Sequence, residues 1–158
     1  MKRTLTLLLL VLTLVLAGCG GEGAVIQERG DNSPIKVGLI APLTGGAAEL
    51  GIGVKDAVEL AIKEIHAKGG INGRPIQLLI EDGACDPKTA SNAANKLLNI
   101  DKIQFLVGGL CSAESGAITP MTKEAKVLEV SPCSSAPKLT NAGPWFFRTY
   151  PSDAYQAV

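Results

Sequence analysis

Short runs of apolar residues recur along the chain from residue 35 onward, and longer stretches of mixed polarity separate them. Five of these runs have the length of a strand: residues 35–41, 76–81, 103–107, 127–130 and 145–149. Continuous apolar runs of this length are typical of strands that are buried on both faces of a sheet. We therefore predict five strands.

The stretch between the first two runs has the periodicity of an amphipathic helix. Its apolar side chains recur at Val54, Val58, Ala61, Ile62 and Ile65. Residues with this spacing share one face of a helix. Lys68 and the following glycines supply the cation and the glycine that often end a helix. We therefore predict a helix over residues 54–67.

Two more helices are predicted between the later runs. Asp86 is placed to cap the first of them, with Pro87 at its first position. Its buried face is predicted to be Ala90, Ala94, Leu97 and Leu98. Ser112 opens the other helix, whose inner face is predicted to be Ala113, Ala117, Met121 and Ala125. Pro120 lies inside that helix, so we expect a kink or a late start there.

This alternation of strand and helix predicts an α/β fold with a doubly wound parallel sheet. In such a sheet the carboxyl ends of all the strands lie along one edge, where ligands bind. The loops expected at this edge are residues 42–50, 82–87, 108–112 and 131–137, and they are rich in Gly, Ser, Cys and Pro. We call this edge the ligand edge.

The N-terminus has the pattern of an export signal. Lys2 and Arg3 precede a 13-residue apolar run over residues 5–17, which is too short to span a membrane. The run ends in Leu16-Ala17-Gly18-Cys19, which resembles a bacterial lipobox. We expect a lipoprotein signal peptide over residues 1–18, lipidation of Cys19 and a flexible tether over residues 19–33. The alternative is an ordinary signal peptide with an incidental cysteine.

Composition excludes several classes of function. The 158 residues carry 15 basic and 15 acidic side chains, with a pI near 6.6. This balance gives no electrostatic footprint for nucleic acid, so we expect no nucleic-acid partner. The hydrophobic fraction of 46% excludes global disorder. The chain has a single histidine, His66, which makes a His-rich metal site improbable.

Three kinds of chemistry compete as explanations of the ligand edge. Gly51-Ile52-Gly53 begins a dinucleotide-binding pattern, but the third glycine is replaced by Asp56. Cys111 or Ser112 has the position of a hydrolase nucleophile. Such a nucleophile needs a base, and His66 falls near the end of the first helix, at the opposite edge of the sheet. The cysteine spacings match no zinc pattern. We therefore expect no enzyme activity, no cofactor and no metal.

Anion capture at Ser112 is the third kind. The first turn of a helix has free backbone N–H groups and the positive end of the helix dipole, which favour a carboxylate. A Ser112 that only caps its helix would use the same groups, so both interpretations stay open.

Several segments resemble the Leu/Ile/Val-binding proteins of branched-chain amino-acid ABC importers. The most specific are EDGACDPK (81–88), AANKL (93–97) and GGLCS (108–112). Others are IKVG (35–38), PLTG (42–45), AKGGING (67–73), SPCSSAPKLT (131–140) and FRT (147–149). The resemblance implies a periplasmic binding protein of type 1, which has two lobes and binds its ligand in the cleft between them.

The resemblance also implies how this chain is organised. Residues 34–149 correspond to the first ligand-binding lobe, which is incomplete here. Residues 150–158 correspond to the hinge crossing and the start of the second lobe. The family's acidic residue that pairs with the ligand's ammonium group lies in the second lobe, beyond the segments that this chain matches.

The resemblance further implies a ligand set and a disulfide. Ser112, Cys133, Ser134 and Ser135 are the implied ligand-binding residues; the carbonyl of Cys133 takes part, at a position where the family usually has a small residue. From the residues alone, Cys85 and Cys111 both follow strands at the ligand edge, and pairings with Cys133 remain open. The resemblance favours Cys85–Cys111 and leaves Cys133 as a thiol in the cleft.

These observations together suggest a substrate-binding lipoprotein of an ABC transporter, exported and anchored by lipid to the membrane. It would capture an amino acid, with a branched-chain amino acid favoured, and deliver it to an ABC permease. The alternative is a ligand-sensing receptor domain of the same fold that binds amides or another small metabolite.

Overall fold

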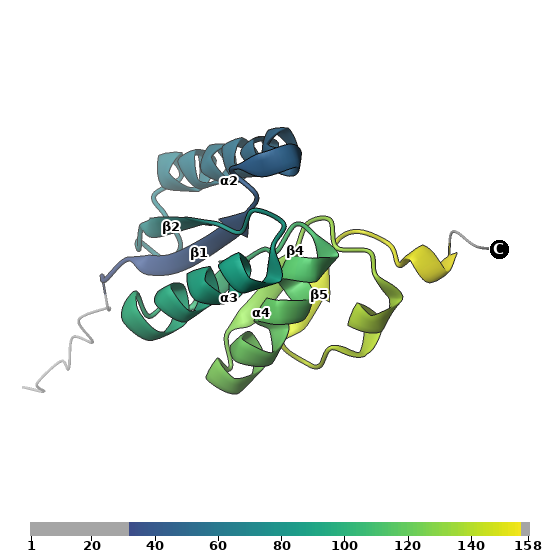
Figure 1. Cartoon of the computed structure of the whole chain (residues 1–158). Coiled ribbons are helices and arrows are strands. Elements are labelled where there is room, and N and C mark those ends of the chain that lie inside the picture. The colour runs from purple at the N-terminus through teal and green to yellow at the C-terminus, as the bar shows by residue number, and fades with distance from the viewer. Residues whose placement is uncertain (1–31, 156–158) are drawn as a thin grey trace, which may run out of the picture. The chain divides into compact units, whose positions relative to one another are not determined.

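The computed structural model describes residues 32–155 as a five-stranded, all-parallel sheet with helices on both faces (Figure 1). The strand order is β2-β1-β3-β4-β5. The strands are β1 (Ile35–Ala41), β2 (Ile76–Asp82), β3 (Phe105–Val107), β4 (Leu128–Ser131) and β5 (Phe146–Arg148). The predicted doubly wound parallel sheet is therefore confirmed. The predicted signal peptide, Cys19 and most of the predicted tether lie outside the described residues.

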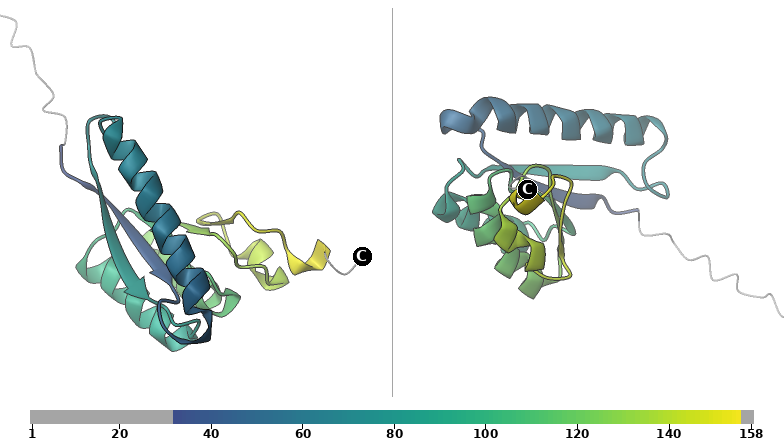
Figure 2. Two further views of the ribbon diagram at one scale, coloured as in Figure 1. Left: turned by 90° about the horizontal axis from the view of Figure 1, so that it is seen from above. Right: turned by 90° about the vertical axis from the view of Figure 1, so that its right-hand side faces the viewer.

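The helices divide between the two faces of the sheet. Helix α2 (Ala48–Ala67) lies on one face, and α3 (Pro87–Asn95) and α4 (Ser112–Ala125) lie on the other (Figure 2). Four short helical segments lie in the connections or after the last strand: η1 (Gly45–Ala47), η2 (Lys96–Ile100), η3 (Pro137–Asn141) and η4 (Asp153–Tyr155). Among the described residues, none of the helices combines the length and apolar character that a membrane span requires.

The main core lies between the sheet and the α3–α4 layer. It includes Ile40 and Leu106 from the strands, with Leu97 and Ile118 from the helical side, and each is at most 1% exposed. The buried face predicted for the helix that Asp86 caps, which is α3 and its continuation η2, is confirmed. Its members Ala90, Ala94, Leu97 and Leu98 are all buried. Asp86 caps that helix by accepting a hydrogen bond from the Thr89 amide at 2.7 Å. The sheet face on the side of α2 is less covered, since the side chains of Phe105 and Phe147 are exposed.

Helix α2 begins six residues before the predicted start at Val54. Its early turns pack against the loop after β1 at Gly51, where an added Cβ would collide with the carbonyl oxygen of Pro42. The glycine that suggested a dinucleotide motif is therefore required by helix packing. Of the predicted apolar face, Ala61 is exposed and the other members are half-buried.

The predicted inner face of α4 is wrong. Ala113 and Ala125 are exposed, and Ala117 and Met121 are only half-buried. The buried residues are instead Glu114, Ser115, Ile118, Thr119 and Thr122. Most of these side chains are polar and form hydrogen bonds inside the protein, so a search for apolar periodicity selects the neighbouring face. The helix starts at Ser112 and continues through Pro120, so the expected late start is absent from this helix.

Candidate functional site

Four loops meet at the ligand edge, and Ser112 joins two of them. It is the first residue of α4 and is half-buried. Its Oγ accepts hydrogen bonds from the backbone amides of Ser135 and Ala136, both at 3.1 Å. The hydrogen bonds of the described residues leave its own proton unused. A hydroxyl can accept twice and donate once, so Ser112 can still donate to a ligand.

Ser112 is not the cap of its helix. The N-cap is Cys111, and Glu114 completes a capping box by accepting the Cys111 amide at 2.9 Å. The interpretation in which Ser112 only caps α4 is therefore wrong, because other groups do the capping. Its hydroxyl is instead directed at the loop after β4.

A network of buried hydroxyl groups holds the loop after β4 on the side that faces the core. Ser131 donates to the carbonyl of Gly109 at 2.6 Å and accepts the amide of Ser134 at 3.0 Å. Ser134 is 1% exposed, and its hydroxyl lies 2.8 Å from the Ser115 hydroxyl. The side chain of Ser134 is therefore directed into the core, away from the edge.

Cys133 and Ser135 flank Ser134 and are both half-buried. The Cys133 thiol is free, and the described hydrogen bonds leave its carbonyl oxygen without a donor. The Ser135 hydroxyl donates to Asp153 Oδ2 at 3.0 Å. Asp153 belongs to the segment expected to enter the second lobe, so this bond ties the loop to the crossing.

Arg148 at the end of β5 fixes the same loop from its other side. Its Nη1 donates to the carbonyl of Ala136 at 3.0 Å, and its Nη2 donates to the Thr140 hydroxyl at 2.8 Å. Sequence reasoning quoted Arg148 only as part of the crossing and missed this role. The signal that could have found it is an arginine directly after a short strand, facing a loop rich in carbonyl groups.

Asp82 connects the first two loops at the end of β2. Its carboxylate accepts the amide of Leu43 at 2.8 Å, the amide of Ala84 at 2.8 Å and the hydroxyl of Thr44. Burial opposes the charge, but these hydrogen bonds together lower the pKa of Asp82 below its usual value. Asp82 therefore holds the loop after β1 as an ionised acceptor.

The structure brings Cys85 and Cys111 together at this edge. Their Cα atoms are 5.4 Å apart and their sulfur atoms are in bonding contact, a separation typical of a disulfide. Glu114 lies against both cysteines, and the three residues place one metal-ligating atom each within 4.8 Å of one another. A disulfide consumes both thiolates that a metal would need, so we assign no metal to this group.

The single histidine lies where the sequence analysis expected it. His66 Nε2 accepts the backbone amide of Ile76, the first residue of β2, at 2.8 Å. It therefore sits at the amino end of that strand, away from Ser112. The position of His66 in the sequence did not indicate this contact, and its distance from the ligand edge removes it as a catalytic base.

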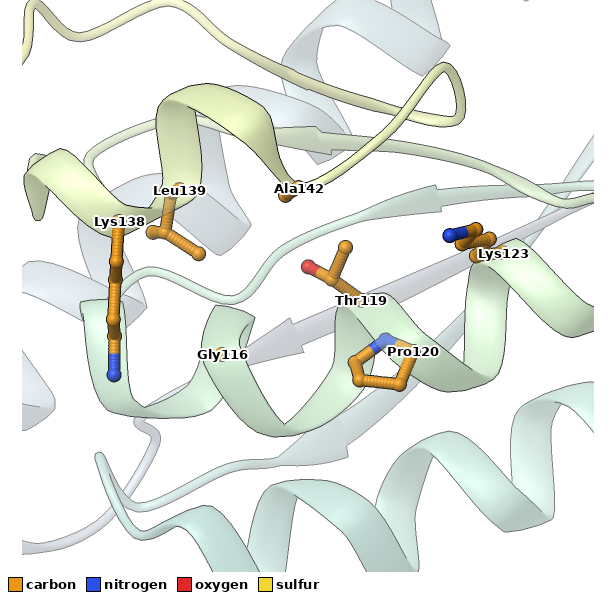
Figure 3. A pocket seen from close by; sticks show the side chains of 7 residues that line it. All are labelled: Gly116, Thr119, Pro120, Lys123, Lys138, Leu139 and Ala142. Carbon is orange, nitrogen blue, oxygen red and sulfur yellow. The ribbon is translucent and has the colours of Figure 1, made fainter.

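A surface cavity of about 300 Å³ lies beside the ligand edge rather than in it (Figure 3). It separates α4 from η3, with Leu139 and Thr119 on its walls and Lys138 and Lys123 at its two ends. Neither Ser112 nor Ser135 lines it. The cavity is thus distinct from the site implied by the resemblance.

Comparisons with known proteins give the family. A family model described as periplasmic binding protein matches residues 34–158. The chain belongs to this family. The Leu/Ile/Val-binding protein of Escherichia coli strain K12 is 37% identical over 129 residues, which are 82% of this chain and 34% of that protein. A leucine-, isoleucine-, valine-, threonine- and alanine-binding protein of Pseudomonas aeruginosa is 37% identical over 123 residues, which are 77% of this chain and 33% of that protein.

Solved structures of the family agree with the fold. The branched-chain amino acid transporter substrate-binding protein of Streptococcus pneumoniae, in complex with isoleucine, has a TM-score of 0.74 and 26% identity, over 77% of this chain and 35% of that chain. A solute-binding protein from Rhodopseudomonas palustris BisB5, in complex with 3,4-dihydroxybenzoic acid, has a TM-score of 0.71 and 29% identity, over 78% and 33%.

These comparisons confirm the resemblance to Leu/Ile/Val-binding proteins and the type 1 periplasmic binding protein fold. The relatives are amino-acid-binding and solute-binding proteins, one of them from an ABC transporter, and not enzymes, as the sequence analysis expected. The chain spans about a third of the length of the curated relatives that it matches.

Proposed function

We propose that this chain forms the first lobe of an exported substrate-binding protein that captures an amino acid for an ABC importer. The observation that carries the proposal is the pairing at Ser112, which joins the N-terminus of α4 to the loop of Cys133 and Ser135. This pairing places hydrogen-bond donors and a free carbonyl oxygen on adjacent loops. An amino acid needs both, because it carries a carboxylate and an ammonium group.

The donor side of the site would bind the carboxylate. The first-turn N–H groups of α4 have no acceptor within the helix, and the helix dipole contributes about 0.3–1 kcal/mol toward an anion there. The Ser112 hydroxyl adds a donor, and the Ser135 hydroxyl can add another if it leaves Asp153. Hydrogen bonds to a charged group stabilise a complex by about 1.5–3 kcal/mol each.

The acceptor side would bind the ammonium group through the carbonyl of Cys133. In this proposal Ser134 contributes by holding the loop, since its own hydroxyl is buried against Ser115 and Gly109. A second lobe would supply the negative charge that completes the pairing. Branched-chain amino acids are favoured as the ligand because the Leu/Ile/Val-binding proteins are the relatives with about 37% identity.

Aromatic carboxylates are a second candidate class of ligand. Solute-binding proteins of Rhodopseudomonas palustris with this fold hold 3,4-dihydroxybenzoic acid and benzoate. These ligands share the carboxylate and lack the ammonium group. They would use the donors at Ser112 and leave the Cys133 carbonyl unpaired, which disfavours them here.

Calorimetric titration distinguishes these ligands. Leucine, isoleucine, valine, alanine, benzoate and 4-hydroxybenzoate would be titrated into protein expressed from its complete gene. The proposal expects that at least one of the aliphatic amino acids binds and that neither benzoate nor 4-hydroxybenzoate binds. Binding of benzoate alone would show that the ligand is an aromatic carboxylate. Binding of none of the six compounds would overturn the proposal. Uptake of the bound amino acid by cells, lost on deletion of the gene, separates import from sensing.

The proposal includes export, a lipid anchor on Cys19 and a disulfide between Cys85 and Cys111. The apolar run that ends at Cys19 supports the anchor. The 5.4 Å separation of the two Cα atoms supports the disulfide, as does an oxidising compartment outside the cytoplasm.

A further inference from the structure

Glu114 is a fully buried carboxyl group whose two oxygens contact two different loops. It is 0% exposed although it lies in the first turn of α4. Its Oε1 accepts the backbone amide of Cys85 at 3.0 Å, and its Oε2 accepts the amide of Cys111 at 2.9 Å. One side chain thus joins the loop after β2 to the N-terminus of α4.

The surrounding backbone is shaped for this carboxyl group. An added Cβ at Gly83 would collide with Glu114 Oε1, and an added Cβ at Gly109 would collide with the Cβ of Glu114. Burial is the main cause that raises the pKa of Glu114, and the amides of Cys111 and Cys85 oppose it. A buried polar group in such a tight niche is costly unless its hydrogen bonds are kept.

We propose that Glu114 is a positioning residue of the ligand edge, which holds Cys85 beside Cys111 and so keeps Ser112 in place whether or not the two cysteines are bonded. The two hydrogen bonds of Glu114, which we call the Glu114 clip, connect the same two loops as the disulfide. Each connection restricts the motion of the loops, so the other connection costs less conformational entropy to form. By reciprocity, the clip favours the disulfide as much as the disulfide favours the clip. Only the part concerning Ser112 rests on the proposed function.

The first test measures thiol–disulfide equilibrium without any ligand. In this exchange the two protein thiols lose two electrons and two protons to one glutathione disulfide, which becomes two glutathione molecules. Glu114→Gln places an amide donor against one of the two backbone amides. We expect the equilibrium constant for forming the Cys85–Cys111 disulfide to fall roughly three- to tenfold.

The matched control is Glu129→Gln. Glu129 is also 0% exposed, but its carboxyl group bonds to Thr119 and Thr122 and to neither cysteine loop. We expect this variant to keep the equilibrium constant within about twofold of the unmodified protein. An equal change in both variants, or no change in Glu114→Gln, would overturn the proposal.

The second test needs no substitution and so does not depend on a variant that folds. Amide hydrogen exchange would be measured at Cys85 and Cys111 in oxidised and in reduced protein. The proposal expects both amides to stay protected after reduction, because Glu114 still accepts them. Exchange of both amides at unprotected rates in the reduced protein would rule the clip out.

The third test connects the clip to the ligand. Leucine would be titrated into oxidised and reduced forms of the unmodified protein and of Glu114→Gln. We expect an affinity loss of about tenfold or more only when both the disulfide and the carboxylate are removed. Equal affinities in all four forms would overturn the role in positioning Ser112. If no amino acid binds any form, the proposed function fails, while the exchange and redox tests still decide the role of Glu114.

Discussion

The hydroxyl of Ser112 accepts the backbone amide of Ser135 at 3.1 Å, so the first residue of α4 fixes the loop that follows β4. This bond links two positions that are 23 residues apart in the chain. Both residues are half-buried at the ligand edge. The pairing organises the loop before any ligand arrives, which reduces the ordering cost of binding.

Ser112→Ala tests this pairing. The change removes one donor to the ligand and leaves the amides of Ser135 and Ala136 without their acceptor. We expect the dissociation constant for the amino acid to rise about tenfold to a hundredfold, measured by calorimetry. Backbone donors survive the change, so some binding should remain. Ser91→Ala, at a half-buried serine of α3 whose hydroxyl donates to the Pro87 carbonyl of the same helix, is the control and should bind normally. A normal dissociation constant in Ser112→Ala would refute the ligand role.

Arg148 provides a separate test of how the loop is held. Arg148→Lys keeps the charge but cannot reach the Ala136 carbonyl and the Thr140 hydroxyl with one planar group. We expect the free energy of unfolding to fall by about 1 kcal/mol and ligand affinity to weaken with it. Denaturant unfolding and calorimetry on the same sample would measure both. Unchanged affinity in a folded Arg148→Lys protein would show that the loop holds its shape without the clamp.

Much of the fold could be predicted because its signals are local. All five strands lie within two residues of their predicted ends, since continuous apolar runs mark buried parallel strands clearly. Asp86 and Pro87 marked the start of α3 correctly for the same local reason. The first helix was predicted too short, because its early turns contain two glycines and have Leu50 and Ile52 exposed, and they are held by the close packing of Gly51 on Pro42.

The parts that escaped prediction depend on partners distant in sequence. Glu114 and Thr122 look like surface residues of a helix, yet both are buried because acceptors and donors reach them from other elements. The role of Arg148 has the same origin, since it depends on where the loop after β4 passes. Periodicity reports only the apolar side of a helix, so it could not find a buried face made mostly of polar groups.

The lipid anchor predicts a clear effect at Cys19, which lies outside the described residues. Cys19→Ala removes the thiol that the lipobox modification requires. We expect the protein to appear in the soluble fraction or to remain as an unprocessed precursor. Membrane fractionation and mass measurement of the N-terminus would show this. Cys133→Ala controls for the loss of a thiol and should leave fractionation unchanged. Membrane association and processing that persist unchanged in Cys19→Ala would favour the alternative of an ordinary signal.

The disulfide predicts a loss of stability that can be measured in the oxidised protein. The sequence separation of 26 residues between Cys85 and Cys111 corresponds to about 3–4 kcal/mol in the loop-entropy account. We expect the double variant Cys85→Ser, Cys111→Ser to lose stability of that order in denaturant unfolding. Cys133→Ser, at a half-buried free thiol, should lose less than about 1 kcal/mol. Peptide mapping that joined Cys133 to either partner would contradict the pairing.

The buried carboxyl group of Glu129 predicts how stability depends on pH. Burial without a cationic partner raises its pKa to about 7, and the hydroxyl groups of Thr122 and Thr119 offset this only in part. A protonated carboxyl group can donate to Thr122, whose hydroxyl then donates to the carbonyl of Thr119 at 3.1 Å. The neutral form therefore satisfies the network.

The sign of the effect follows from this raised pKa. Below about pH 4.5, Glu129 is protonated in both the folded and the unfolded chain, so its titration does not change the free energy of unfolding. Between about pH 4.5 and 7 the unfolded chain loses the proton first, and the folded protein becomes progressively less stable, by about 3 kcal/mol in total. Asp82 and Asp86, whose pKa values are lowered, act at lower pH and in the opposite direction.

Glu129→Gln isolates this contribution, because glutamine has the same shape and does not ionise. We expect the variant to be about as stable as the unmodified protein near pH 4.5 and more stable by up to about 3 kcal/mol near pH 8. Denaturant unfolding of both proteins across this range gives the difference at each pH. Glu114, whose pKa is also raised, is present in both proteins and cancels in that difference. A difference that stays constant from pH 4.5 to 8 would show that Glu129 does not change protonation on folding, and its carboxyl group would then have to be ionised inside the core.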